Sequence, residues 1–206
     1  MSKNYGENPP LSYNQYLRVQ DLINLQDVLS DPAHHDELLF ITVHQAYELW
    51  FKQILHELDA AIQFLLDDRL PAATRAIKRI VEIEKLLVQQ IHILETMTPI
   101  SFLAFRDELN PASGFQSMQF REIEFSSGLK DERILREFRE DQFAYERLRV
   151  RMDQPSLADA FYGVLERRGF DVGQRARAVL EILTHFESRY EEFQLSEALL
   201  EHDEYF

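Results

Sequence analysis

Leu38-Leu39-Phe40-Ile41-Thr42-Val43-His44-Gln45 begins the most apolar part of the chain, which continues to Leu58. If this stretch is drawn as a helix, apolar side chains stand on most of its sides rather than on one stripe. Such a helix needs neighbours around it to bury that surface, so we expect it at the centre of a helical bundle. The stretch therefore indicates an all-α fold.

The sequence on either side of this stretch also has helical periodicity. Residues 12–29 predict an amphipathic helix. Ser30-Asp31-Pro32 is a helix-start signal, so we expect the next helix to run from there to about Asp68, with a break near His35-Asp36 left open. No Asn-Gly or Asp-Gly hairpin turn and no long alternating run occurs. The other predicted helices span 71–97, 102–109, 113–128, 131–151, 155–168 and 172 to the C-terminus.

Composition limits the function classes. The 206 residues carry a formal net charge of −14, which argues against binding to a nucleic-acid backbone. No cysteine is present, so disulfides, thiolate metal sites and a cysteine nucleophile are excluded. No apolar run approaches the ~18 residues of a membrane span, and the polar start has no secretory signal. We expect a flexible arm at 1–10, one domain at 11–206, and a cytoplasmic protein with a small-molecule or protein partner.

His44 lies in the most apolar segment and has two interpretations. It is either a core histidine bonded to a neighbour such as Glu48, one helical turn further on, or a neutral base or hydrogen-bond acceptor in a closed pocket. In the second case Phe40 shares its helix face. A metal centre made by the protein alone is not expected, because no Glu-x-x-His pair recurs on two helices. The histidines His92, His185 and His202 are isolated in the sequence and are interpreted as surface or core residues.

Arg106 stands among aromatic residues, and a cation there requires an anionic partner. The partner is either an internal carboxylate (Glu108, Glu122 or Glu124) or the carboxylate of a ligand. Ser113-x-x-Gln116 matches a capping box, and a helix start beside Gly114 also offers backbone N–H groups to an anion. Together with His44, these residues outline a pocket for an aromatic molecule that bears a carboxylate.

Tyr13-x-x-Tyr16-Leu17 forms one aromatic face of the first predicted helix. A stripe of this kind belongs to the core, closes over a ligand, or packs into a second subunit, and spacing alone leaves the three alternatives open.

In their order and length, the motifs of this chain resemble those of the tryptophan 2,3-dioxygenase family. The similarity covers most of the chain from about residue 11 and is strongest over 11–57 and 94–125. The motifs are Tyr13-x-x-Tyr16-Leu17, His35-Asp36-Glu37-Leu38-Leu39-Phe40-Ile41-x-x-His44-Gln45-x-x-Glu48-Leu49-Trp50, Phe105-Arg106 and Pro111-x-Ser113-Gly114-Phe115-Gln116-Ser117.

The resemblance implies an all-α homotetramer that inserts both atoms of O2 into the indole ring of L-tryptophan on a b-type haem. The product is N-formyl-L-kynurenine, the first step of tryptophan catabolism by the kynurenine pathway. By the same resemblance, His44 hydrogen-bonds the indole N–H and Arg106 pairs with the substrate carboxylate. Further substrate contacts fall on Phe40, Ile41, Thr42, Val43, Phe102 and the face Tyr13, Tyr16, Leu17, whereas Ser113 and Gly114 lie near the haem.

The family's proximal haem-ligating histidine follows a Trp-Arg-x-Arg-His type segment, which this sequence does not contain. None of the seven histidines matches that ligand, so we expect a C-terminally truncated chain whose axial ligand lies beyond Phe206. The alternatives are a haem-less, non-catalytic member that binds tryptophan or another indole or aromatic carboxylate, and a helical interaction module.

Overall fold

The computed structural model describes residues 11–206, so the arm predicted at 1–10 lies outside the described residues. Every regular element of 11–206 is a helix, which confirms the all-α prediction. No helix in this part of the chain is long and apolar enough to cross a membrane. The α-helices are α1 Tyr13–Leu17, α2 Val19–Leu22, α3 His35–Leu66, α4 Leu70–Leu94, α5 Pro99–Leu103, α6 Met118–Ser127, α7 Glu132–Glu137, α8 Gln142–Asp153, α9 Leu157–Arg167, α10 Arg175–Thr184 and α11 Tyr190–Tyr205, with 3-10 turns at Arg106–Leu109, Gly114–Gln116 and Val172–Gln174.

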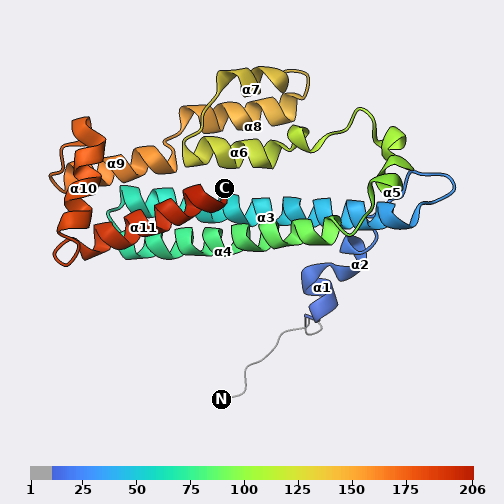
Figure 1. The fold of residues 1–206 in the computed structure, drawn as a ribbon, viewed down its shortest axis with the longest axis horizontal. Coiled ribbons are helices and arrows are strands. Elements are labelled where there is room, and N and C mark those ends of the chain that lie inside the picture. The colour runs from blue at the N-terminus through green and yellow to red at the C-terminus, as the bar shows by residue number, and fades with distance from the viewer. Residues whose placement is uncertain (1–10) are drawn as a thin grey trace, which may run out of the picture.

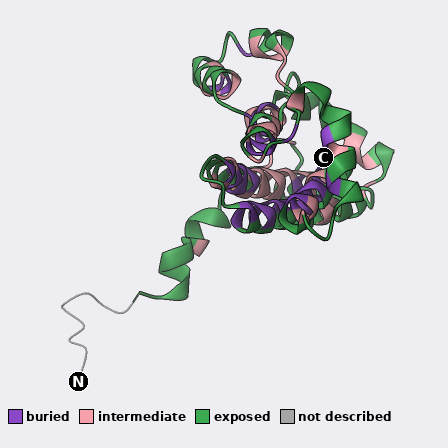
Figure 2. Ribbon diagram, turned by 90° about the vertical axis from the view of Figure 1, so that its left-hand side faces the viewer, coloured by how far each residue is buried: buried purple, intermediate pink, exposed green. Residues whose placement is uncertain are grey.

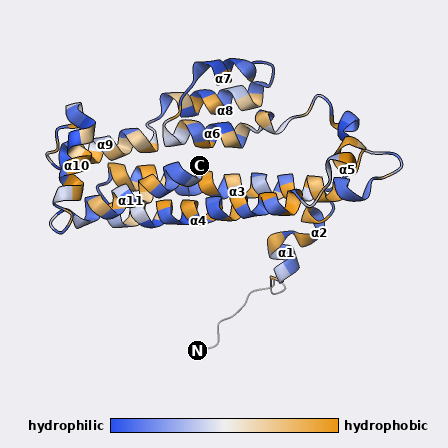
Figure 3. Cartoon of the chain, in the orientation of Figure 1, coloured by the Kyte–Doolittle hydropathy of each residue, from blue (hydrophilic) through white to orange (hydrophobic). Residues whose placement is uncertain are grey.

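Two long antiparallel helices, α3 and α4, form the centre of the molecule (Figure 1). Helix α4 has Pro71 in its first turn, where the missing N–H costs nothing. Helix α11 returns along α4, whereas α6 and α9 pack on α3, and α8 covers α6. Hydrophobic and hydrophilic residues alternate along α3 and α4, as expected for helices with both packed and solvated faces (Figure 3).

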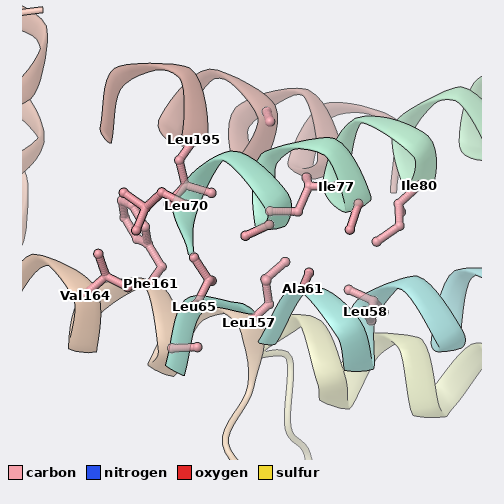
Figure 4. Packing of buried hydrophobic residues seen from close by; sticks show 14 of the residues in the cluster. Leu58, Ala61, Leu65, Leu70, Ile77, Ile80, Leu157, Phe161, Val164 and Leu195 are labelled. Carbon is pink, nitrogen blue, oxygen red and sulfur yellow. The ribbon is translucent and has the colours of Figure 1, made fainter. Parts of the chain in front are cut away.

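The main core lies around the C-terminal half of α3, which we call the core end (Ile54–Leu65). Leu58, Ala61 and Leu65 are fully buried there, against α4, α9 and α11 (Figure 4). A smaller cluster around Phe125, between α6 and α8, is separate from it. The prediction that the whole of Leu38 to Leu58 is central is therefore only half right. Buried positions concentrate at the core end, and the N-terminal turns of α3 are largely half-buried or exposed (Figure 2).

The first predicted helix, 12–29, is wrong beyond its first turns. Arg18 adopts a left-handed conformation (φ 51°, ψ 43°) that ends α1, and α2 stops at Leu22. The next residues form a non-helical strap, residues 24–34, which crosses to α3. The start predicted at Ser30-Asp31-Pro32 is also wrong, because His34 caps α3 by accepting a hydrogen bond from the Asp36 N–H through Nδ1 (3.2 Å).

Three more predicted helices are interrupted. The 113–128 helix is a 3-10 turn followed by α6, because Ser117 caps the second helix through the Phe120 N–H. The 131–151 helix divides where Asp141 caps α8. The helix predicted from 172 divides after Thr184, where a turn folds α11 back onto α4. Of the helix predicted at 102–109, only the end of α5 and a 3-10 turn at Arg106–Leu109 exist. The helices predicted at 71–97 and 155–168 are confirmed, because they match α4 and α9 to within three residues at each end.

Candidate functional site

Aromatic rings gather where the N-terminal turns of α3 meet α5. We call Phe40, Phe102 and Phe105 the ring platform. Their centroids lie 5.6 Å apart for Phe40–Phe102, 5.8 Å for Phe40–Phe105 and 5.6 Å for Phe102–Phe105. These are the separations of favourable aromatic pairs. Residues about 60 positions apart in the sequence thus form one apolar surface, and Phe105, to which the sequence assigned no role, is its buried member.

His44 lies against this platform, with its ring centroid 4.1 Å from that of Phe40. Its Nδ1 is 2.7 Å from the backbone oxygen of Phe40. A carbonyl oxygen can only accept, so Nδ1 carries the proton, and Nε2 of the neutral ring keeps a free lone pair. His44 therefore offers a hydrogen-bond acceptor to an N–H donor.

His44 does bond a neighbour one helical turn away, but the partner is the Phe40 carbonyl and not Glu48. The Glu48 carboxylate accepts instead from Nε2 of Gln119 on α6, at 2.8 Å. A hollow of about 380 Å³ opens beside both residues, between α3, α6 and the chain around α2. The half-buried His44 ring lies at the edge of this hollow.

Arg106 follows the platform directly, and its guanidinium carbon lies 5.4 Å from the centroid of the Phe102 ring. The internal ion pairs considered for it are not formed. Glu122 pairs with Arg147 and Arg151, and Glu124 pairs with Arg121. Within 11–206, no carboxylate lies at ion-pair distance from Arg106, so its exposed charge is available to an external anion.

The capping box at Ser113 is confirmed, on a short 3-10 turn. Ser113 Oγ accepts from the Phe115 N–H at 3.3 Å, and the Gln116 side chain accepts from the Ser113 N–H at 3.0 Å. A Cβ atom built on Gly114 meets nothing within 4 Å, and Phe115 is 81% exposed. This turn is therefore an open surface feature that makes no described contact with the ring platform.

The remaining predicted substrate residues fall into two places. Ile41, Thr42 and Val43 occupy the turn of α3 before His44, but only Val43 is buried. Tyr13 and Tyr16 are 74% and 72% exposed on α1, with Leu17 beside them. The core alternative for this stripe is therefore wrong in the isolated chain. Neither tyrosine is among the rings that pair with the ring platform within 11–206, so the structure does not bring all predicted residues together.

His202, interpreted as isolated, belongs to a buried cluster. Its Nδ1 lies 2.8 Å from Oε1 of Glu84, and its Nε2 lies 3.0 Å from Oγ of Ser127. The arrangement is that of a nucleophile, base and orienting acid, but the N–H groups of Gly128 and Leu129 both donate to the Glu124 carbonyl. No free backbone donor stands beside Ser127 to hold an oxyanion. We therefore interpret the cluster as a structural link between α4, α6 and α11.

No cluster of three or more potential metal ligands (His, Cys, Asp or Glu) occurs in the residues that the structure describes. Of the histidines there, His202 has both ring nitrogens engaged, and His34 uses Nδ1 as a helix cap. His35, His56, His92 and His185 are exposed.

Comparison with known proteins gives one consistent result. The model of the tryptophan 2,3-dioxygenase family matches residues 1–195. A tryptophan 2,3-dioxygenase of Nocardioides sp. is 50% identical over 202 residues, which are 94% of this chain and 76% of the relative. Those of Herpetosiphon aurantiacus and Saccharopolyspora erythraea are 49% and 45% identical over 162 residues, 79% of this chain. The aligned part spans only 62% and 58% of these two relatives.

Proposed function

The chain belongs to the tryptophan 2,3-dioxygenase family, and from this premise we propose that it binds L-tryptophan and takes part in its oxidation by O2 to N-formyl-L-kynurenine. The observation that carries the proposal is Arg106, unpaired within 11–206, beside the Phe40–Phe102 pair and His44. An amino acid with a flat, N–H-bearing ring complements these three elements together.

Each element has a separate part in binding. The Arg106 guanidinium can donate two parallel hydrogen bonds to the substrate carboxylate. Nε2 of His44 accepts from the indole N–H, since Nδ1 is engaged with Phe40. The rings of Phe40 and Phe102 supply the apolar contact for the indole. An analogue that lacks the N–H leaves His44 unpaired, and this is how the site discriminates.

The other predicted contacts belong to the same proposal. We propose that Ile41, Thr42 and Val43 also contact the substrate, and their position on the α3 turn that precedes His44 supports this role. Tyr13, Tyr16 and Leu17 would act on a neighbouring subunit of a homotetramer, and their exposure on α1 supports an intermolecular role. Cytoplasmic location is likewise part of the proposal and is supported by the family resemblance.

The family is haem-dependent, and haem b supplies the redox chemistry of its reaction when bound. In this proposal neither His44 nor His202 is available as an axial ligand. Nε2 of His44 is the acceptor on the substrate side, and His202 has no free ring nitrogen. From the family resemblance alone, we propose that Ser113 and Gly114 lie near the cofactor. We derive no reaction step through the cofactor.

The same observation favours a second candidate, a member that binds tryptophan or another indole carboxylate without haem. Calorimetry of the 206-residue chain with L-tryptophan tests binding. Haem addition and an assay for N-formyl-L-kynurenine, carried out on the protein expressed from the complete reading frame, separate the two candidates. Binding, a Soret band and product support the dioxygenase. Binding with no haem uptake supports the haem-less member. Absence of tryptophan binding contradicts both.

A further inference from the structure

Glu37, in the first turn of α3, has a fully buried carboxylate that no part of the proposed chemistry uses. A buried carboxylate is costly unless hydrogen bonds compensate it. Here the donors come from the strap, residues 24–34. The Leu29 N–H donates to Oε1 at 2.7 Å, the Ser30 N–H donates to Oε2 at 3.0 Å, and the Ser30 hydroxyl also donates to Oε2.

Burial raises the pKa of Glu37, but the Ser30 hydroxyl, the two backbone N–H groups and the nearby His34 together hold the pKa below its ordinary value. The carboxylate is therefore charged at neutral pH, when it binds these donors most strongly. No cation pairs with Glu37 among residues 11–206, so this acid is satisfied by the strap itself.

A chain of contacts leads from Glu37 to the ring platform. The Ser30 hydroxyl, which donates to Glu37, accepts the His34 N–H at 2.8 Å. The His34 ring then lies 5.4 Å from the Phe105 ring, centroid to centroid. Phe105 in turn meets Phe40 and Phe102.

Gln45, next to His44, holds the other end of the strap. Its Nε2 donates to the Leu25 backbone oxygen at 2.9 Å, and its Oε1 accepts from Gln26 at 2.5 Å. The strap is thus attached to α3 on both sides of the His44 turn. Because α1 and α2 contact each other more than the rest of the fold, these two attachments also set where α2 and the tyrosine-bearing α1 leave the body (Figure 1).

From this geometry we propose that Glu37 is a positioning residue for the tryptophan site. Its carboxylate fixes the strap, and the strap places His34 and Phe105 so that the ring platform is formed before substrate arrives. The inference rests on the proposed function for its ligand, but the order of the strap and of the platform is independent of any ligand. Pre-organisation of this kind improves affinity by lowering the cost of ordering on binding.

The test compares Glu37→Gln with Asp36→Asn. Both replace a first-turn acid of α3 with its amide, so both remove the same favourable charge at the helix start. Of the two carboxylates, only that of Glu37 accepts hydrogen bonds from the strap. Amide hydrogen exchange of Leu29, Ser30 and His34 is expected to quicken about tenfold or more in Glu37→Gln, the equivalent of losing one hydrogen bond to a charged group. Asp36→Asn should leave it unchanged.

Tryptophan affinity, measured by calorimetry, is expected to fall about 5- to 10-fold in Glu37→Gln and less than twofold in Asp36→Asn, a coupling of ordinary size. Ser30→Ala should weaken binding in the same direction, and its effect should be smaller in the Glu37→Gln background, because both changes break one chain of contacts. Faster strap exchange with unchanged affinity would overturn the positioning role.

If the unmodified chain binds no tryptophan, the proposed function has failed, and the inference is decided on the free protein. The NMR ring resonances of Phe102 and Phe105 should then shift in Glu37→Gln and not in Asp36→Asn. Unshifted resonances contradict the inference. If Glu37→Gln does not fold, Ser30→Ala takes its place in the exchange and ring-resonance measurements. Faster exchange and shifted resonances then support the inference, and unchanged values contradict it.

Discussion

The two ends of α3 differ in what their side chains lack. At the core end, Leu58 is 0% exposed and sits among leucines and isoleucines from α4. At the other end, which we call the site end (Leu38–Trp50), Leu49 is 54% exposed, although the sequence there is at least as apolar. The core end lacks free space, whereas the site end and the ring platform beside it lack partners. No carboxylate of 11–206 pairs with Arg106 next to the platform, and His44 has a free acceptor nitrogen. Apolar sequence favours burial, but neighbouring elements decide where it occurs.

The largest expected effect comes from the core end. Leu58→Ala should lower the free energy of unfolding by about 2–5 kcal/mol, because it removes a fully buried side chain and leaves a cavity. The measurement is chemical denaturation followed by circular dichroism. Leu49→Ala is the matched control on the same helix and should change stability by about 0.5 kcal/mol or less. Equal losses at both sites would remove the contrast between the two ends.

Arg106→Ala tests the site end directly. It should weaken L-tryptophan binding by about 10- to 150-fold, the equivalent of about 1.5–3 kcal/mol for hydrogen bonds to a charged group. Stability should stay within about 0.5 kcal/mol, since the side chain is exposed and has no ion pair in 11–206. Calorimetry measures the affinity for L-tryptophan, and chemical denaturation measures the free energy of unfolding. The control is Arg75→Ala, an exposed arginine on α4 that also has no ion pair in this range. A pure stability loss in Arg106→Ala would favour the helical interaction module.

A smaller effect is expected for the acceptor nitrogen of His44. His44→Ala should reduce affinity for L-tryptophan by about 2- to 12-fold, corresponding to one neutral hydrogen bond of about 0.5–1.5 kcal/mol. 1-Methyl-L-tryptophan has no indole N–H, so the same substitution should hardly change its affinity. Calorimetry with both ligands on both proteins completes the cycle. If both ligands lose affinity equally, His44 contributes packing alone.

The smallest expected effect on stability is at the start of α9, a helix that packs against the core end. Asp159 closes the capping box of α9, and the Ser156 N–H and hydroxyl hold the pKa of this carboxyl below its ordinary value. The stabilisation is complete above the unfolded pKa of about 3.9 and is lost as the pH falls through the lower folded value. Asp159→Asn should therefore cost about 0.3–1 kcal/mol at pH 7, because the side chain is partly exposed.

Unfolding measured from pH 7 to pH 2 provides the test. The stability difference between Asp159→Asn and the unmodified chain should narrow as the Asp159 carboxyl is protonated at acid pH. A difference that stays constant with pH would mean that the effect of Asp159 does not depend on its charge.

Features encoded by neighbouring residues could be predicted from the sequence. The all-α class, the bounds of α4 and α9 and the capping box at Ser113 depend on periodicity and on bonds within four residues. The same logic failed for residues 23–34. Their leucines have helical spacing, but Glu37 and Gln45 hold their backbone in an extended strap instead. Tertiary hydrogen bonds to a buried charge outweigh the small propensity difference between helix and coil.

The candidate site divides in the same way. His44 and Arg106 stood out in the sequence because a polar group among apolar neighbours needs a partner, wherever it lies in the fold. Only the tertiary structure decided which partner each one has or lacks. Glu122 pairs with Arg147 and Arg151, and Glu124 pairs with Arg121, which leaves Arg106 unpaired in the part of the chain that the structure describes. The tertiary structure also brings Phe40 against Phe102 and buries His202 between Glu84 and Ser127. The Phe40–Phe102, Ser127–His202 and Glu84–His202 pairings link residues about 60 to 120 positions apart, and they depend on how whole helices pack, which no local pattern specifies.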